Sequence, residues 1–284
     1  MAAGLTPGMG FQSSWEMQRP LNPRRTGTFQ HPRLNESSGV TASRRQPGIL
    51  WTLNDSGNEP LIFATDTLGR DHGAFTVTDA RNGDWEAIAL GPCGKRECLY
   101  IADTGDNGRS RRTVRLYRVP EPLLPANSPR TRPAEVLELR YPGGSRDVEA
   151  VFVAPDGAAY LITKTRGGSV RVLRAPASAW GGGNTVAAEA VGKLPIESNG
   201  LADMVTDAAI SPSGERVAVR TYGSIYLFGF VRQVGLLPLD VACDATGLQL
   251  QGEGISWLDD RVLVLTSEGG FGLPGTIVLL ECGP

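Results

Sequence analysis

The chain has 284 residues and a net charge of −2, from 28 lysines and arginines against 30 aspartates and glutamates. General nucleic-acid and membrane-surface binders are usually far more basic, so neither partner is expected. The 36 glycines and 20 prolines leave few windows for a long helix, and no window approaches the roughly 20 apolar residues of a membrane span. We expect a turn-rich, monomeric globular protein.

The first ten residues, MAAGLTPGMG, have neither the basic nor the apolar region of a signal peptide. On this ground the protein is either cytoplasmic or lacks its signal in this chain. The cysteines favour the second alternative if they pair. We predict disulfides Cys93–Cys98 and Cys243–Cys282, with free buried thiols as the alternative; no CxxC motif and only two histidines argue against zinc. Disulfides would indicate a secreted or periplasmic protein.

Short apolar runs follow one another along the whole chain. Each has four to eight residues, is rich in Val, Ile, Leu and Tyr, and is bounded by Gly, Pro, Asp or Asn, which is typical of β-strands. In chain order they are residues 48–53, 61–65, 98–103, 114–119, 135–141, 150–154, 159–164, 170–175, 216–221, 224–230, 261–266 and 276–281. This pattern predicts an all-β sandwich, barrel or propeller.

One short element recurs five times at intervals of roughly 45–63 residues, which selects the propeller. Its copies are ESSGVT (36–41), DWEAIA (84–89), DVEAVF (147–152), TDAAIS (206–211) and QGEGIS (251–256). Two or three further strands follow each copy, so residues 36–284 are predicted to form five four-stranded blades within a single domain that spans residues 1–284. Two separate β-domains would need a linker, and the best candidate, 120–135, is interpreted as a surface loop inside blade two.

The fifth blade has only three strands of its own, at residues 255–258, 261–266 and 276–281. We therefore predict that the N-terminal segment, residues 1–34, supplies the fourth strand from somewhere in residues 10–34. This closure would remove the exposed sheet edges that an open ring would leave.

The repeated element is predicted to begin the innermost strand of each blade, next to the central channel. The residues before its small residue are Ser38, Glu86, Glu149, Ala208 and Glu253. Three carboxylates held close together need a compensating charge, and a hard cation with oxygen ligands provides it. With no His or Cys nearby, we predict that these five positions hold Ca²⁺ on the axis. The alternative is that the acids face loops and are solvated.

The loops between the second and third strands open onto the same face. They contribute a rim of polar side chains to which we assign two roles. Predicted catalytic residues are Asp55, Asp103, Lys164 and Arg220. Predicted ligand-binding residues are Asn54, Asp106, Asn107, Arg166, Tyr222 and Glu268. Lys and Arg beside a calcium ion suit a phosphate or carboxylate ligand, so a small anionic ligand is expected. Ordinary loop polarity is the alternative for each residue.

At the five repeat positions the chain offers, in order, a serine, two glutamates, a residue that contributes only its backbone, and a third glutamate. This order resembles that of the calcium-activated apyrase family of soluble nucleotidases. That resemblance covers about residues 36–257 and implies a five-bladed propeller with one axial Ca²⁺ that hydrolyses nucleoside di- and triphosphates. Carried over, Ser38, Glu86, Glu149 and Glu253 match calcium positions, whereas DAAIS in blade four departs from the family's serine. The segments WTLNDSG, DWEAIA and YIADTGDN with RVPEP also resemble a group of uncharacterised secreted bacterial propeller proteins.

Two classes of function follow from these features. The first is a Ca²⁺-dependent hydrolase of phosphorylated small molecules, in which the ion polarises the phosphoryl oxygens and Lys164 and Arg220 hold charge. The second is a non-catalytic propeller that binds a ligand or partner and uses calcium as a structural plug. A metal-dependent lactonase or esterase is a weaker alternative, because that type has six blades.

Overall fold

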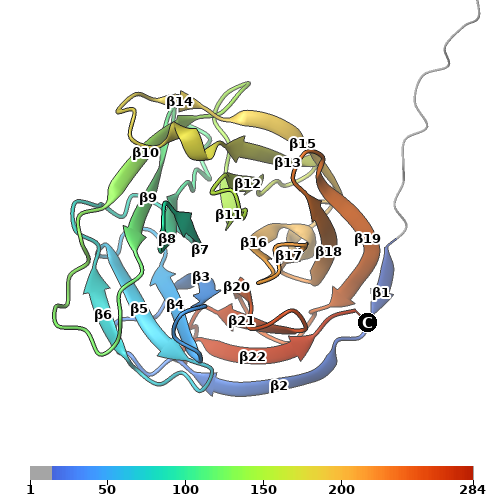
Figure 1. Ribbon diagram of the computed structural model, residues 1–284. Coiled ribbons are helices and arrows are strands. Elements are labelled where there is room, and N and C mark those ends of the chain that lie inside the picture. The colour runs from blue at the N-terminus through green and yellow to red at the C-terminus, as the bar shows by residue number, and fades with distance from the viewer. Residues whose placement is uncertain (1–14, 284) are drawn as a thin grey trace, which may run out of the picture.

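The computed structural model describes residues 15–283. Its strands form five sheets arranged as blades around a central axis, which confirms the five-bladed β-propeller (Figure 1). Within the described residues only two short 3₁₀ helices occur, η1 (Ala177–Ala179) and η2 (Leu201–Asp203). No helix among residues 15–283 is long and apolar enough to cross a bilayer.

Each blade begins at the axis and ends at the outside, and its strands are antiparallel except for a short parallel strand at the outer edge of blades 2 and 4. Blade 1 contains β3 (Ser37–Ala42), β4 (Ile49–Asn54), β5 (Leu61–Asp66) and β6 (Gly73–Thr76). Blade 2 contains β7 (Trp85–Cys93), β8 (Arg96–Asp103), β9 (Val114–Pro120), β10 (Glu135–Arg140) and β14 (Val186–Ala187). Blade 3 contains β11 (Val148–Val153), β12 (Ala159–Thr163), β13 (Ser169–Ala175) and β15 (Glu189–Glu197).

The last two blades share the N-terminal segment. Blade 4 contains β16 (Val205–Ile210), β17 (Arg216–Thr221), β18 (Ser224–Val231), β19 (Gly235–Asp244) and β1 (Glu16–Gln18). Blade 5 contains β20 (Gly252–Trp257), β21 (Val262–Ser267), β22 (Thr276–Glu281) and β2 (Leu21–Thr28). The predicted closure is confirmed, because β2 pairs antiparallel with β22, Arg25 opposite Val278. The part of the predicted closing region before residue 15 lies outside the described residues.

The apolar residues gather between the blades. Five buried clusters lie one at each interface between neighbouring blades, as between Trp51 of blade 1 and Trp85 of blade 2. Inner strands carry this burial: every residue of β11 and β20 is buried. Burial of apolar side chains from two sheets at once is what holds the blades in a ring.

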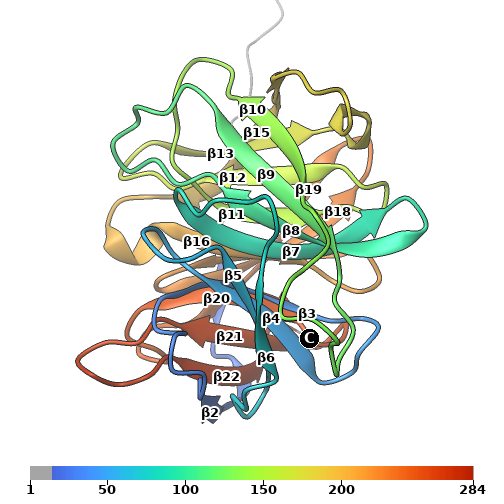
Figure 2. The same cartoon turned by 90° about the vertical axis from the view of Figure 1, so that its left-hand side faces the viewer.

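The two loop faces of the ring are distinct. The five inner strands, β3, β7, β11, β16 and β20, start at one face and end at the other. The loops at the starting face project to the left in Figure 2, and the β7–β8 hairpin projects to the right. The segment 120–135 joins β9 to β10, which confirms that it is a loop inside blade two.

Both predicted disulfides form: Cys93–Cys98 in the β7–β8 hairpin and Cys243–Cys282 between β19 and the C-terminal end. Two disulfides are consistent with an extracellular or periplasmic protein.

We expect the two bridges to contribute unequally to stability. Their sequence separations are 5 and 39 residues. In the loop-entropy description, Cys243→Ser/Cys282→Ser therefore lowers the free energy of unfolding by about 4 kcal/mol, and Cys93→Ser/Cys98→Ser by about 2 kcal/mol. Denaturant unfolding of the two double variants measures both values. Equal losses would contradict the entropic explanation.

Candidate functional site

All five inner strands carry a β-bulge close to their first residue. The pairing with the second strand skips one position in each of blades 1 to 4 and two positions in blade 5. The skipped residues are Ser38, Glu86, Glu149, Thr206 and the pair Glu253 and Gly254. A bulge redirects a side chain and locally ends regular pairing. The repeated sequence element thus corresponds to a repeated backbone irregularity at one end of the axis.

The position predicted for blade four is wrong by two residues. The bulge lies at Thr206, whereas Ala208 pairs regularly with Val219 and lines a cavity toward the opposite face. The reason is that Asp207 occupies the position that a small residue fills in the other blades. Its fully buried carboxylate accepts hydrogen bonds from the amides of Ala208 (2.8 Å) and of Ile255 in blade 5 (2.9 Å).

Two of the bulge residues have hydroxyl groups that connect neighbouring blades. The Ser38 hydroxyl donates to the carbonyl oxygen of Trp85 in blade 2 (3.0 Å), and the Thr206 hydroxyl donates to that of Glu253 in blade 5 (2.9 Å). Both side chains are buried. Each therefore stabilises an interface between inner strands.

The three bulge glutamates, Glu86, Glu149 and Glu253, are each at most 6 % exposed. Burial, and next the neighbouring Glu149, raise the pKa of Glu86 well above its ordinary value. Burial raises the pKa of Glu149 to about 7, although Lys164 opposes the rise. Charged carboxylates this close destabilise one another unless a proton or cation intervenes.

Lys164 lies between the glutamates. Its Nζ is 3.0 Å from Oε1 of Glu149 and 3.4 Å from the hydroxyl of Tyr222, which donates to Oε1 of Glu253 (2.9 Å). Burial disfavours the ammonium ion, but Glu149, Tyr222 and Glu253 together outweigh it and raise the pKa of Lys164. Burial raises the pKa of Glu253 to about 8. The lysine therefore separates Glu253 from the other two glutamates.

Three aspartates complete the acidic group. Carboxylate oxygens of Asp55, Asp84 and Glu86 lie within 4.8 Å of one another, as do those of Glu86, Asp147 and Glu149. Burial, followed by the charge of Asp55, raises the pKa of Asp84 to about 6. These five carboxylates form a continuous cluster centred on Glu86. We call the cluster, together with Glu253, the acidic mouth.

Gly105 packs directly against this cluster. A Cβ at position 105 would lie 2.1 Å from Oε1 of Glu86 and 2.5 Å from Oδ2 of Asp84. The β8–β9 loop can therefore close over the carboxylates only with glycine here.

We expect Gly105→Ala to displace Glu86 and Asp84 and so weaken cation binding by at least about tenfold, since it disturbs two carboxylates at once. Gly108→Ala in the same loop is the matched control, because its Cβ meets nothing closer than 3.8 Å. Calcium titrations of both variants by calorimetry measure the difference. Equal affinities would show that the cluster does not hold the ion.

Several residues predicted for the rim lie in the interior. Arg220 is 1 % exposed, and its Nη1 donates to the carbonyl oxygens of Gly254 (2.7 Å) and Thr266 (2.8 Å) in blade 5. Burial lowers its pKa to about 10. Asp103 is 1 % exposed and forms an ion pair with Arg111 at 2.8 Å. Neither side chain reaches the loop surface, so their predicted placement is wrong.

Two further predicted ligand residues are also used within the protein. The amide of Asn54 bonds to the carbonyl oxygen of Arg33, and its oxygen accepts from the amide of Glu36 (3.1 Å). The carboxylate of Asp106 is buried and accepts from the amides of its own loop, at residues 110 and 111. These side chains shape the loops rather than face a ligand.

The remaining predicted residues stay at the surface of this face. Asn107 and Arg166 are exposed, and Asp55, Lys164, Tyr222 and Glu268 are half-buried. Burial raises the pKa of Glu268 to about 7, with Asp55 as the next cause. The functional role of all of them stays a prediction.

A cluster of arginines beside the acidic mouth was not expected. Arg109, Arg146 and Arg171 line a pocket of about 150 Å³ together with Asp147 and Lys164. Within the described part of the chain none of the three forms an ion pair. We call this the arginine pocket. Its members come from three separate loops and strands, so only the proximity of RSRR (109–112) to the acidic loop hinted at it.

Comparisons with known proteins bear on the fold. No family model and no curated protein matches the sequence. The PQQ-bound form of an aldose sugar dehydrogenase from Streptomyces coelicolor is similar in structure, with a TM-score of 0.54 and 13% identity over 94% of this chain and 100% of that one. Hydrazine synthase from Kuenenia stuttgartiensis matches at a TM-score of 0.40 and 14% identity, over 89% of this chain and 65% of that one. The first likeness supports the propeller fold alone.

Proposed function

We propose that the protein binds calcium at the acidic mouth and hydrolyses a phosphorylated small molecule held between the ion and the arginine pocket. The observation that carries this proposal is that Asp147 belongs to both places, and that Lys164 of the arginine pocket forms an ion pair with Glu149 of the acidic mouth. Asp147 shares the carboxylate cluster with Glu86 and Glu149, and it also lines the arginine pocket. A cation and an anionic group could therefore bind side by side.

The donors present fit calcium. Asp55, Asp84, Glu86, Asp147 and Glu149 offer only oxygen, and Ca²⁺ takes about six to eight oxygen ligands. Burial raises the pKa values of both Asp84 and Glu149, so a cation bound among the carboxylates would favour their ionised forms. We therefore revise the predicted ligand set: Asp55, Asp84 and Asp147 replace Ser38, Ala208 and Glu253.

In this arrangement the ion, when bound, would polarise a phosphoryl oxygen. The arginine pocket and Lys164 would bind the remaining phosphoryl oxygens through charge-assisted hydrogen bonds. Asp55 lies half-buried at the outer edge of the cluster, and we assign to it the orientation of the attacking water. Tyr222, itself bonded to Glu253, would help to position Lys164.

One observation favours the non-catalytic alternative. Lys164 forms an ion pair with Glu149 and so already brings one positive charge to the acidic mouth. A purely structural calcium site would need such a charge. Calcium would then complete the charge balance and the arginine pocket would bind an anion without turnover. Activity measurements separate the two functions.

We expect calcium to raise the melting temperature and EDTA to lower it. Binding to the native state alone adds about 2.7 kcal/mol when calcium is at one hundred times its Kd. Glu149→Gln should raise the calcium concentration needed for half of this stabilisation by at least about tenfold, because it removes one ligand charge and keeps the shape of the side chain. Glu215→Gln, at an exposed position, is the control. A melting curve insensitive to calcium and EDTA would refute the metal site.

Catalysis is tested with the calcium-loaded protein on nucleoside di- and triphosphates, p-nitrophenyl phosphate and lactones. PQQ together with an aldose sugar is also tested, because the structurally similar protein is a PQQ-bound aldose sugar dehydrogenase. We expect calcium-dependent phosphate release, with a raised KM in Arg146→Gln. Phosphate binding without release would support the non-catalytic alternative, and turnover of lactone or sugar alone would overturn the proposal.

A further inference from the structure

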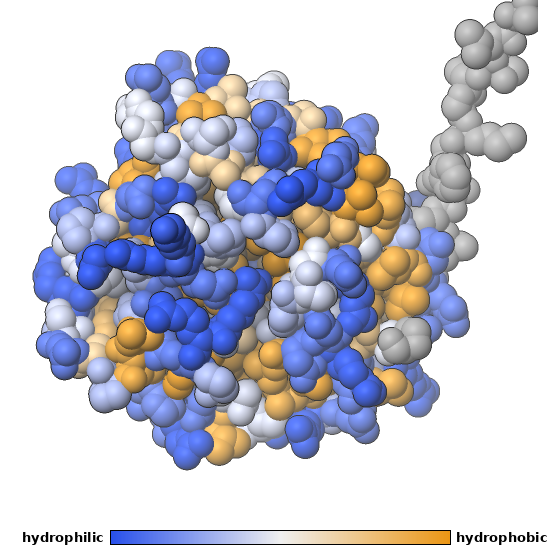
Figure 3. Space-filling view, viewed as in Figure 1, coloured by the Kyte–Doolittle hydropathy of each residue, from blue (hydrophilic) through white to orange (hydrophobic). Residues whose placement is uncertain are grey.

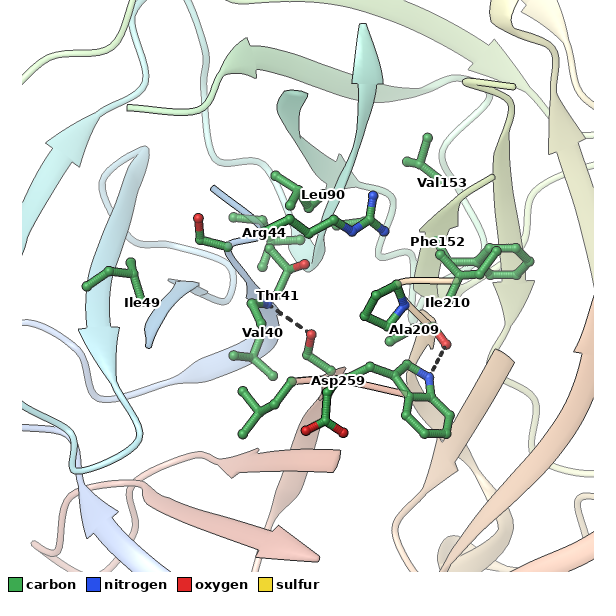
Figure 4. A pocket seen from close by; sticks show the side chains of 18 of the residues that line it. Val40, Thr41, Arg44, Ile49, Leu90, Phe152, Val153, Ala209, Ile210 and Asp259 are labelled. Atoms are coloured by element: carbon green, nitrogen blue, oxygen red, sulfur yellow. Dashed lines mark hydrogen bonds between the residues drawn. The ribbon is translucent and has the colours of Figure 1, made fainter. Parts of the chain in front are cut away.

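A second cavity lies at the opposite end of the axis from the acidic mouth. It has a volume of about 460 Å³ and is lined where the five inner strands end. Figure 3 looks onto this face, and Figure 4 shows the lining side chains. We call it the rear cavity. It shares no lining residue with the arginine pocket.

The walls of the rear cavity are mainly apolar. Leu90, Val153 and Ile210, from blades 2, 3 and 4, line it as Figure 4 shows. Trp257 of blade 5 lines it too. An apolar cavity of several hundred Å³ with few polar groups is typical of sites for small organic molecules. The walls therefore favour a ligand with an apolar body.

The polar groups of the wall are largely used within the protein. The indole N–H of Trp257 donates to the carbonyl oxygen of Ala209 (3.1 Å), and the hydroxyl of Ser256 accepts from the amide of Ala42 (2.9 Å). At the rim, Asp259 accepts from the amides of Arg261 and Val262 (2.8 Å each). The adjacent Asp260 likewise accepts from the amide of Ser213 (3.1 Å).

Arg44 is different. Its guanidinium extends across the cavity from the loop after β3, as Figure 4 shows. Within the described residues its guanidinium forms one polar contact, an ion pair from Nη1 to Oε1 of Glu97 at the edge of the β7–β8 hairpin (3.2 Å). A guanidinium has five N–H donors, so most of its donors remain free for an acceptor in the cavity.

We propose that the rear cavity binds a small amphipathic anion, with an apolar body against the walls and one carboxylate or sulfonate on Arg44. This site is separate from the acidic mouth and does not depend on the function proposed there. The two rim aspartates disfavour ligands with several negative charges, because only Arg44 among the lining residues is cationic. A monoanion of the size of decanoate is the probe of choice.

The proposal is tested by calorimetric titration of the intact protein with decanoate, decanol and decylamine. We expect saturable binding of decanoate, weaker binding of decanol, and the weakest binding of decylamine. Arg44→Gln should reduce decanoate affinity by about tenfold or more, because a hydrogen bond to a charged group is lost, and leave decanol unchanged. Arg45→Gln is the matched control, since Arg45 lines a different surface hollow beside Lys95.

A second variant tests the place of binding. Ile210→Trp should fill the rear cavity and abolish binding of decanoate and decanol alike, with the melting temperature as a check of folding. EDTA and Glu149→Gln should change neither affinity. Absence of saturable decanoate binding to the native protein, equal effects of Arg44→Gln and Arg45→Gln, or binding that persists in a folded Ile210→Trp protein would overturn the proposal.

Discussion

Deletion of residues 1–28 is expected to prevent the protein from folding into a soluble native state. The deletion removes β2, whose pairing with β22 closes the ring, and leaves the edge of β22 with Val278, Leu279 and Leu280 without their covering strand. An exposed apolar strand edge promotes aggregation. Solubility, circular dichroism and the melting temperature measure the effect.

A shorter deletion provides the control. Removing residues 1–18 takes away β1, which adds a parallel strand to β19, together with the contacts of Trp15 with Tyr226 and Phe228, but it keeps β2. We expect this protein to fold with a lowered melting temperature. If the protein that lacks residues 1–28 melted at the same temperature as the full chain, closure by β2 would not matter for stability.

Without calcium, stability should fall as the pH rises from 5 to 8. The pKa values of Asp84, Glu149 and Glu253 are raised to about 6, 7 and 8, above the 3.8 or 4.5 of the free groups. The native state therefore binds protons that the unfolded state has already released, and this stabilisation is lost as the pH passes through the native values. Each tenfold difference in proton affinity between the two states corresponds to about 1.4 kcal/mol, so the three groups together should lower the melting temperature by roughly 10–15 °C.

Melting curves in EDTA at pH 5, 6, 7 and 8 check this prediction. Saturating calcium should flatten the fall, because the ion replaces the protons between the carboxylates. Glu253→Gln should lessen the fall between pH 7 and 8, whereas Glu215→Gln should leave it unchanged. A melting temperature in EDTA that rises over this range would mean that the mouth is already neutralised by the chain itself.

The inner half of each blade was predictable from the sequence, and much of the outer half was not. The second strand of each blade is largely buried and mainly apolar, and the innermost strand is marked by the repeated element. The outermost strands β15 and β19 are largely exposed and contain Gly192, Pro195 and Pro238, so no strand pattern marks them. The short parallel strands β1 and β14 depend on neighbours distant in the chain and carry no local signal.

The candidate site was predictable in part for a similar reason. Glu86, Glu149 and Glu253 could be aligned because a small residue and a β-branched or apolar residue follow each of them. In blade four the buried Asp207 takes the place of the small residue, which shifted the alignment to Ala208. The interior position of Arg220 results from acceptor carbonyls in another blade, which a single sequence does not reveal.

The link between Cys243 and Cys282 makes the two chain ends unequal under mechanical load. The C-terminal end is bound covalently to β19 and cannot be drawn out while the bridge is intact. The described part of the N-terminal segment is held without a covalent link, by the pairing of β1 with β19 and of β2 with β22 and by the contacts of Trp15. If the molecule is pulled by its two ends, rupture therefore starts at β1 and proceeds through β2, so that the ring unzips in one direction. Reduction of the bridge would open a second route, through β22, and lengthen the first extension step.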